Sequence, residues 1–519
     1  MQLVTGDRRL QELEQELEKR NSLNRTANET RPSILPSPVP QFTTDDLPPS
    51  VAPFEVQKPI FHPRQVGDVI LTAVAIEEIL QHYFTVFHPS FLVTADQDQF
   101  LKTWDQNEFL LWTIVAIASK STDAYPHFHA ALQPHVRRLA SDIYSLDNDP
   151  LRNVQALLLL CWWPFTFAAT KDDPSWAYCA LAVHIALKHG FHRPGRHSDY
   201  VYNSMLDAHQ MQMYDRTWAG CGIIDQSDYS RLSSHLGIPA TVRLRAVASK
   251  ILPSVIGQLH RVACHAYQIC QSIGDCDEGS TGLLPNAMSI IPTLESHLNV
   301  LDGDLCDISE PIVDIALLRT KLQLYSFVFI ADGVTSVASV EISVILAKAS
   351  TVAVGLIHIA TTRILHRPWP AMVKMSVFFA ANFLLFLSTL PGQDNQLVVR
   401  NAINESWRTL QSQSEFENDS CSRWSQIILY LSQIYSEKPS SHQPVPSVKS
   451  RMSSNITWEN VWRARTRFSE QLRGSKPSDY TLAAALENAA SLDVVDLTFD
   501  PQFLHGFDAE EASNWFAEI

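Results

Sequence analysis

Enzyme motifs are missing from this sequence. It has no G-x-G-x-x-G fingerprint, no P-loop, no G-x-S-x-G turn and no H-E-x-x-H zinc motif. Its nineteen histidines form no cluster with metal-ligand spacing. His260 and Cys264 lie four apart on a predicted helix, but Cys270 and Cys276 follow at six-residue steps, which rotate about 240° around a helix. Asp225 is a candidate buried acid, yet one carboxylate supports no mechanism. We expect no catalytic residue, metal or cofactor site in this chain.

A basic surface, a secretory signal and a membrane-length apolar run are also lacking. The net charge is −15 and the pI about 5.7, so DNA contact would require a local basic module. Polar and charged residues follow Met1, which argues against a signal peptide. The longest apolar run, Met375–Leu390, is shorter than a membrane span and contains Asn382. It predicts a buried helix and no membrane contact.

Cysteine is absent from the first 160 residues. The eight cysteines begin at Cys161 and are scattered, and several fall in apolar stretches with helical spacing. This usage is typical of small buried thiols in a reducing compartment. Hydrophobic residues make up 45% of the chain and charged residues 18%, which is an ordinary core-forming composition.

A short heptad pattern lies near the N-terminus. Within and before the stretch RRLQELEQELEKR at residues 8–20, Leu3, Leu10 and Leu17 are seven apart, and Leu13 supplies the intermediate position. A helix this short is marginal in isolation. Two interpretations remain open: a dimerisation seam with a second copy or a related chain, or a solvated helix that frays.

Proline and the hydrophobic period divide the rest of the chain. Nine prolines interrupt the segment before Gly67, and from there to about Tyr435 helical periods dominate while strand alternation is nearly absent. We expect an all-α protein with a large irregular helical domain, either bundle-like or solenoid-like, and disordered linkers and tail. The expected segments are a helix at 1–21, a linker at 22–66, the helical domain at 67–436, a linker at 437–457, a helical segment at 458–486 and a tail at 487–519.

One predicted helix, between Asp173 and Gly190, has a recognisable start, apolar face and end. Asp173 is a candidate cap, Pro174 suits the first helical position, and Gly190 ends the helix. Apolar residues between them recur at i, i+3, i+4, i+7 and i+11. Further helices are predicted at 154–163, 203–226, 253–272, 311–329, 341–366 and 369–389.

Basic residues gather at two places. Lys188, His192 and Arg193 surround the helix end at Gly190, where cations complement the helix C-terminus; we favour this interpretation over an anion site. Residues 458–473 predict a basic amphipathic helix. We favour a solvated face for it, because it lacks the partner motifs of a DNA-reading geometry.

The last thirty-three residues, 487–519, contain eight acidic residues and no Lys or Arg. Large apolar residues stand between the acids, among them Phe499, Phe503, Leu504, Phe507, Trp515 and Phe516. Charge keeps such a tail solvated while its apolar groups remain available to dock on a partner, which is typical of an activation segment that folds when bound. The alternative is a C-terminal helix that packs on the domain.

Several motifs occur in an order that resembles a known family. They are YFTVFHP at 83–89, LLWTIVAIAS at 110–119, VQALLL at 154–159, Trp176 through Ala182 to Gly190 and HR at 192–193, RTWA at 216–219 followed by QS at 226–227, and GIP at 237–239. Together they resemble the fungal-specific transcription factor domain, the middle homology region of fungal binuclear zinc-cluster regulators. The RTWA variant, with HRPWP at 366–370, is similar to regulators of leucine biosynthesis, weak-acid response and secreted proteases.

The resemblance implies a nuclear regulator of transcription in a fungus, which controls a metabolic or secondary-metabolite gene set. It implies pairing through the N-terminal helix, coactivators recruited by the tail, and a helical domain that restrains the tail until a small metabolite binds. Such regulators normally carry a six-cysteine zinc cluster with C-x2-C-x6-C spacing. Here no cysteine precedes Cys161. We therefore expect zinc and direct DNA contact only through an upstream module. The alternative is a cofactor or inhibitor that pairs with a complete regulator.

Overall fold

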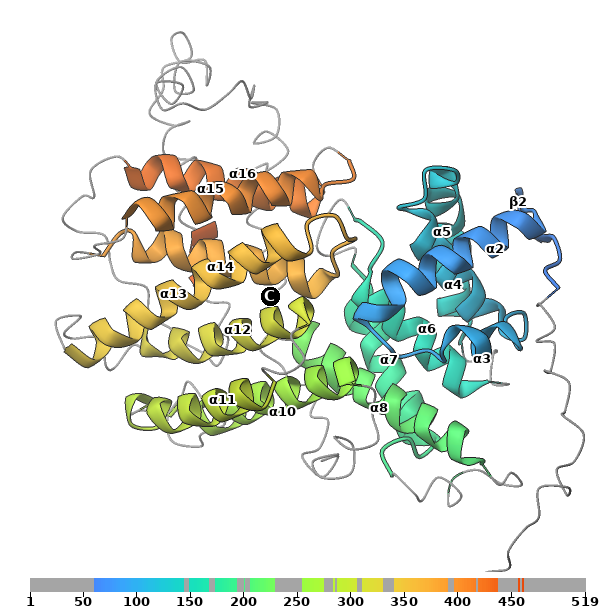
Figure 1. The fold of residues 1–519 in the computed structure, drawn as a ribbon, viewed down its shortest axis with the longest axis horizontal. Coiled ribbons are helices and arrows are strands. Elements are labelled where there is room, and N and C mark those ends of the chain that lie inside the picture. Colours follow the sequence, from blue (N-terminus) through green and yellow to red (C-terminus); the bar gives the residue numbers. More distant parts are fainter. Residues whose placement is uncertain are drawn as a thin grey trace, which may run out of the picture. The chain divides into compact units, whose positions relative to one another are not determined.

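The structure is a computed structural model of the chain. It describes residues 60–143, 149–167, 173–193, 200, 206–228, 254–274, 283–284, 287–305, 310–329, 340–390, 396–416, 419–436, 456–457 and 460–461. These residues form fourteen α-helices, short 3₁₀ and π segments and one two-stranded sheet (Figure 1). The expected all-α class is therefore confirmed for the described part of the chain.

A small hairpin precedes the helices. Strands β1 (Arg64–Val66) and β2 (Val69–Leu71) pair antiparallel, with Arg64 opposite Leu71. Gly67 takes φ +54° in the connecting turn, a conformation that costs glycine little. Three residues of this hairpin belong to the range that we assigned to the first linker. Period-2 alternation over three residues is too short to be detected in a sequence.

The first group of helices follows the hairpin. Its members are α2 (Ala73–His82), α3 (Gln97–Leu101), α4 (Glu108–Ser119), α5 (Pro126–Ser141), α6 (Pro150–Trp162), α7 (Ser175–Lys188) and α8 (Ala208–Asp228). Helix α6 contacts α4, α7 and α8, and every residue from Asn153 to Trp162 is buried. The helix predicted at 154–163 is thus confirmed, and its buried position agrees with a sequence that is apolar nearly all round.

Helix α7 ends as its sequence predicts. Ser175 N donates to Asp173 Oδ1 at 2.9 Å at the start of the helix. At its end Gly190 takes φ +74°, Gly190 N donates to Leu187 O at 3.2 Å, and Phe191 N donates to Ala186 O at 2.9 Å. These two bonds form the Schellman arrangement, in which a left-handed residue satisfies the last carbonyls of a helix.

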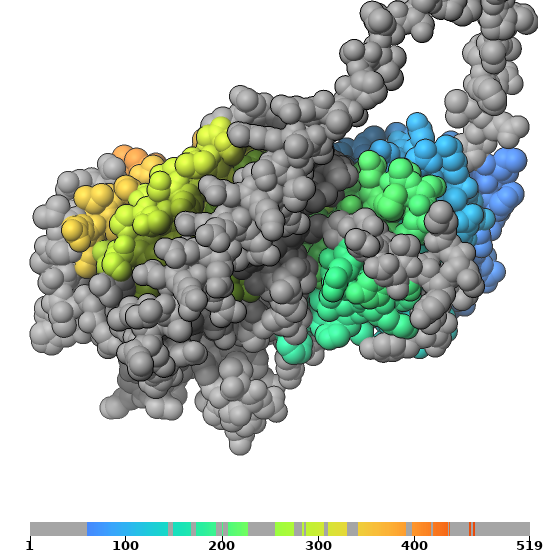
Figure 2. Space-filling view, turned by 90° about the horizontal axis from the view of Figure 1, so that it is seen from below, coloured from blue at the N-terminus to red at the C-terminus, as the bar shows by residue number. Residues whose placement is uncertain are grey.

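The second group lies beside the first (Figure 1). Its members are α10 (Ser254–Gly274), α11 (Ile291–Leu305), α12 (Pro311–Ser326), α13 (Val340–Arg363), α14 (Ala371–Leu387), α15 (Gln396–Ser412) and α16 (Ser420–Ser436). From α12 onward each helix contacts its successor, and α10 joins the groups through its contact with α8. From below, yellow-green residues of the second group lie on one side of the face and green residues of the α7–α8 region on the other (Figure 2).

Two helices of this group are strongly apolar. All residues of α14 except Lys374 are buried, as the run at 375–390 predicts. Within the described residues, α13 is the one helix that has the length and apolar character needed to cross a membrane, over Glu341–Arg363. In this structure α13 packs against α12, α14 and α15.

Candidate functional site

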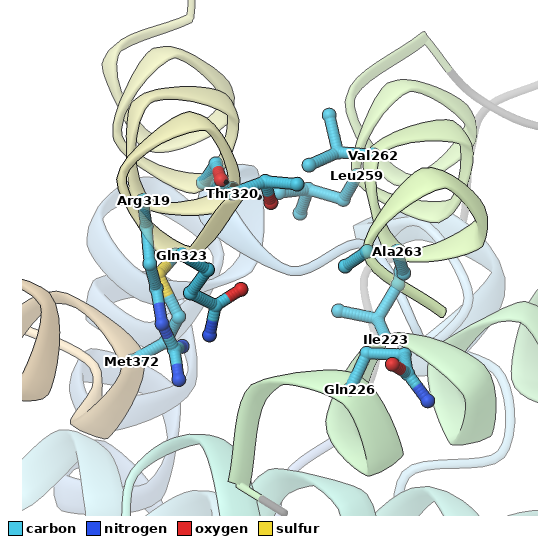
Figure 3. Close-up of a pocket in the computed structure, with 11 residues that line it drawn as sticks. Ile223, Gln226, Leu259, Val262, Ala263, Arg319, Thr320, Gln323 and Met372 are labelled. Atoms are coloured by element: carbon cyan, nitrogen blue, oxygen red, sulfur yellow. Dashed lines mark hydrogen bonds between the residues drawn. The ribbon is translucent and has the colours of Figure 1, made fainter. Parts of the chain in front are cut away.

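A small cavity lies where the two groups of helices meet (Figure 3). Helices α8, α10, α12 and α14 surround it, and its volume is about 30 Å³. Its lining residues are Ile223, Gln226, Leu259, Val262, Ala263, Ala266, Ala316, Arg319, Thr320, Gln323 and Met372. The cavity is thus built at the junction of the first group with the second.

Two helices contribute one stripe each to the cavity wall. On α10 the lining residues Leu259, Val262, Ala263 and Ala266 recur at i, i+3, i+4 and i+7. On α12 the same spacing holds from Ala316 through Arg319 and Thr320 to Gln323. This is the spacing of a single helix face. The alanines among these residues are short, which leaves space between helices whose other side chains pack closely.

The cavity is apolar on the α10 side and polar on the α12 side. Figure 3 shows the Gln323 amide and the Arg319 guanidinium on one side of the gap and Gln226 on another. Arg319 is buried, and Thr320 Oγ1 donates to the carbonyl of Ala316 in its own helix at 2.9 Å. A cavity of about 30 Å³ admits one or two water molecules. A metabolite would therefore require these helices to move apart.

Two buried titratable groups lie close to this junction. Asp225 on α8 is 3% exposed, and burial raises the pKa of its carboxyl to about 6. Its Oδ2 accepts a hydrogen bond from Gln226 Nε2 at 2.9 Å, and its Oδ1 has no hydrogen-bond partner. His260 on α10 is buried, and burial lowers the pKa of its imidazole to about 4. At neutral pH His260 is uncharged, while Asp225 bears a charge that its surroundings oppose.

A second polar cluster links α4 and α5 to the turn between α15 and α16. The Glu415 carboxylate forms an ion pair with Lys120, accepts a hydrogen bond from Thr166 Oγ1 and lies 3.6 Å from His129 Nε2. Burial alone would raise the pKa of Glu415, but the bonds and charges of His129, Lys120 and Thr166 outweigh it and hold this pKa below its ordinary value. The amide of Glu415 also donates to Asp419 Oδ2 at 2.6 Å, which fixes the turn.

The dimerisation and tail residues named from the sequence lie outside the described part of the chain. Leu3, Leu10, Leu13 and Leu17 precede it, and the six apolar tail residues from Phe499 to Phe516 follow it. Their roles stay predictions.

Cys276 and most of the predicted basic helix at 458–473 also lie outside the described residues, whereas His260, Cys264 and His192 lie within them. Cys264 Sγ lies 3.6 Å from His260 Nδ1, and no group of three His, Cys, Asp or Glu side chains suited to a metal occurs among the described residues. Near Gly190, His192 packs edge-on against Trp218 with ring centroids 6.1 Å apart.

The comparison with known protein families decides what kind of domain this is. Residues 80–235 match the sequence model of the fungal specific transcription factor domain. The chain contains a fungal specific transcription factor domain. In the structure, the described residues of that range run from the end of α2 to α8. The family's sequence signal therefore falls on the first helical group, and its last helix, α8, forms one wall of the cavity.

Curated relatives extend the similarity beyond the matched domain. The chain is 26% identical over 415 residues to the putative transcription factor SEF1 of Eremothecium gossypii, covering 76% of the chain and 38% of that protein. It is 23% identical over 444 residues to SEF1 of Kluyveromyces lactis, covering 82% and 39%. It is 24% identical over 298 residues to the regulatory protein LEU3 of Saccharomyces cerevisiae, covering 51% and 33%. The aligned part is thus less than two-fifths of each of these relatives.

Sequence analysis missed several polar residues that the structure places at junctions. Arg319 and Gln323 line the cavity, Glu415 links distant helices, and Asn460 is fully buried after the second linker. Arg319 and Gln323 lie four apart on α12, and this spacing, which places two side chains on one face of a helix, can be found in the sequence. Nothing in the sequence around Glu415 or Asn460 marks them.

Proposed function

We propose that this chain is a fungal regulator of transcription that acts in the nucleus and controls a metabolic or secondary-metabolite gene set. The observation that carries the proposal is the family match at residues 80–235, with similarity to proteins named as transcription factors over 76% and 82% of the chain. The similarity to LEU3, named a regulatory protein, supports the same class of function. None of these names denotes an enzyme.

The partners in this proposal are inferred from two parts of the sequence, the leucine pattern at residues 3–17 and the acidic tail at residues 487–519. The leucines at 3, 10, 13 and 17 pair the chain with a second copy or a related zinc-cluster regulator. The acidic, aromatic tail at 487–519 recruits transcription coactivators. DNA is contacted indirectly or through an upstream zinc module, and zinc enters only with that module. In this proposal the two groups of helices perform no chemistry and bind no membrane.

The tail's part is tested by fusing residues 487–519 to a foreign DNA-binding domain in front of a reporter gene. We expect activation, and we expect it to be lost when Phe499, Phe503 and Phe507 are replaced together by alanine, because the acids alone offer no apolar surface to a partner. A matched control replaces Ser491, Thr498 and Ser513 by alanine and keeps the activity. A silent wild-type fusion would remove activation from the proposal.

The second candidate is a cofactor or inhibitor that pairs with a complete zinc-cluster regulator. The leucine spacing near the N-terminus favours it, because the same seam admits heterodimers. Gel-shift experiments with residues 1–519 separate the candidates. Binding to DNA that appears only with a partner regulator supports the second candidate. Equal binding with and without the partner contradicts it.

A further inference from the structure

Residues at the end of the predicted second linker and just after it are buried in the helical body, which consists of the two groups of helices from α2 to α16. Residues 456–457 and 460–461 are helical, Ile456 is 1% exposed and Asn460 is 0% exposed. Ile456 belongs to the hydrophobic core, and Val461 packs against that core. Residues 437–455 separate this segment from the end of α16.

Asn460 joins this segment to two helices. Its Nδ2 donates to the carbonyl of Asn382 in α14 at 2.8 Å, and its Oδ1 accepts from the hydroxyl of Tyr435 in α16 at 3.2 Å. Asn382 is itself 0% exposed, and its own Nδ2 donates to Phe378 O at 2.8 Å. The backbone carbonyl of Asn382, which is buried in the mostly apolar helix α14, thus accepts a hydrogen bond from a side chain 78 residues later in the chain.

The side chain at position 460 donates one hydrogen bond and accepts another. The side chain there has to donate to a carbonyl on one helix and accept from a hydroxyl on the other. A carboxamide does both with one planar group, whereas an aliphatic side chain does neither. Ile456 is 1% exposed and Asn460 is 0% exposed, so both side chains are buried in the body. Ile456 contributes buried apolar surface, and Asn460 contributes the two hydrogen bonds.

The chain before the segment is rich in breakers of regular structure. The sequence EKPSSHQPVPSVKSR at 437–451 contains three prolines. Nineteen residues span up to about 65 Å when extended, so chain connectivity does not force residue 456 into any one position. The contacts of the segment itself hold it in place.

We propose that α14 and α16 form a peptide seat, defined by Asn382 and Tyr435, and that residues 456–461 occupy it as a separable ligand recognised through Asn460. The seat fits a peptide that carries an aliphatic residue and, four places later, an asparagine. This inference does not depend on the proposed function in transcription.

The test uses the full chain with a specific protease site inserted between residues 445 and 446. After cleavage, the fragment that starts at residue 446 is expected to co-elute with the body at low micromolar concentration. Asn460→Ala is expected to weaken its retention at least tenfold. The matched control is Asn401→Ala, an exposed asparagine on α15, which leaves retention unchanged. Immediate separation of the wild-type fragment, or full retention of the Asn460→Ala fragment, would overturn the proposal.

A competition measurement on the cleaved chain needs no substitution at Asn460. A synthetic peptide of residues 454–463, added in excess to the cleaved wild-type chain, is expected to displace the fragment. The same peptide with alanine in place of Asn460 is expected to leave it bound. Displacement by neither peptide, or equally by both, contradicts recognition through the carboxamide.

Discussion

Lys120, at the end of α4, forms an ion pair with Glu415, which lies 295 residues later in the turn between α15 and α16. The pair joins the family domain to the last two helices of the body. Thr166 and His129 approach the same carboxylate, so Glu415 is the centre of the link. The side chain of Glu415 is 19% exposed, which limits screening by solvent.

Replacing Glu415 by glutamine is expected to lower the free energy of unfolding by about 1–3 kcal/mol, because the hydrogen bonds lose their charge and Lys120 loses its partner. Urea denaturation at pH 7 measures the change. Glu405→Gln, at an exposed position on α15, is the matched control and should change stability little. Equal effects of both substitutions would contradict the role of the link.

The same pair predicts a pH dependence. The folded-state pKa of Glu415 lies below the unfolded value of about 4.3. Its stabilising contribution is therefore fully present above that value and is lost as the pH falls through the folded-state pKa. Denaturation midpoints of the wild type and Glu415→Gln should differ most at pH 6–7 and converge on acidification below about pH 4. A gap that stays constant with pH would show that the charge is not responsible.

Asp225 predicts the opposite trend. Its folded-state pKa of about 6 lies above the unfolded value of about 3.9. The folded state holds its proton longer, so stability is lost as the pH rises from about 4 to beyond 6. Asp225→Asn is expected to remove this loss, gaining up to about 2–3 kcal/mol relative to the wild type between pH 4 and pH 8. Chemical denaturation across this range measures it, and parallel pH profiles would be the contrary outcome.

Replacement of Gly190 and of Gly303 by alanine should change the stability of the fold in opposite directions. Gly190→Ala places a Cβ at φ +74° and 2.4 Å from the ring of Tyr200, so a loss of at least about 1–2 kcal/mol is expected. Gly303→Ala on α11 meets nothing within 4 Å and should stabilise the helix by up to about 1 kcal/mol. Thermal unfolding of the two variants compares them. A destabilised Gly303→Ala variant would contradict the open surroundings that the structure gives this position.

Local features were the ones that sequence reasoning could predict. The core helices α6 and α14 follow from apolar runs with few polar residues, and the end of α7 follows from Gly190. The sequence pattern that predicts each of these features spans about fifteen residues. Periodicity and capping act over this range, so a single sequence is sufficient.

Contacts between distant segments could not be predicted. The sequence near Glu415 looks like an ordinary polar turn, and its partner Lys120 lies on a different helix. Asn460 lies in a stretch that reads as the start of a basic helix, and its burial depends on a carbonyl of α14. The cavity exists because faces of four helices converge. These features depend on tertiary packing, which the local pattern leaves open.

Chromatin occupancy combined with gene deletion decides whether this chain regulates transcription. The epitope-tagged chain is mapped on the genome of its host, and transcripts are compared with and without the gene. A regulator of transcription is expected to occupy a limited set of promoters whose transcripts change on deletion. A chain that occupies no promoter, and whose deletion leaves those transcripts unchanged, would contradict this expectation.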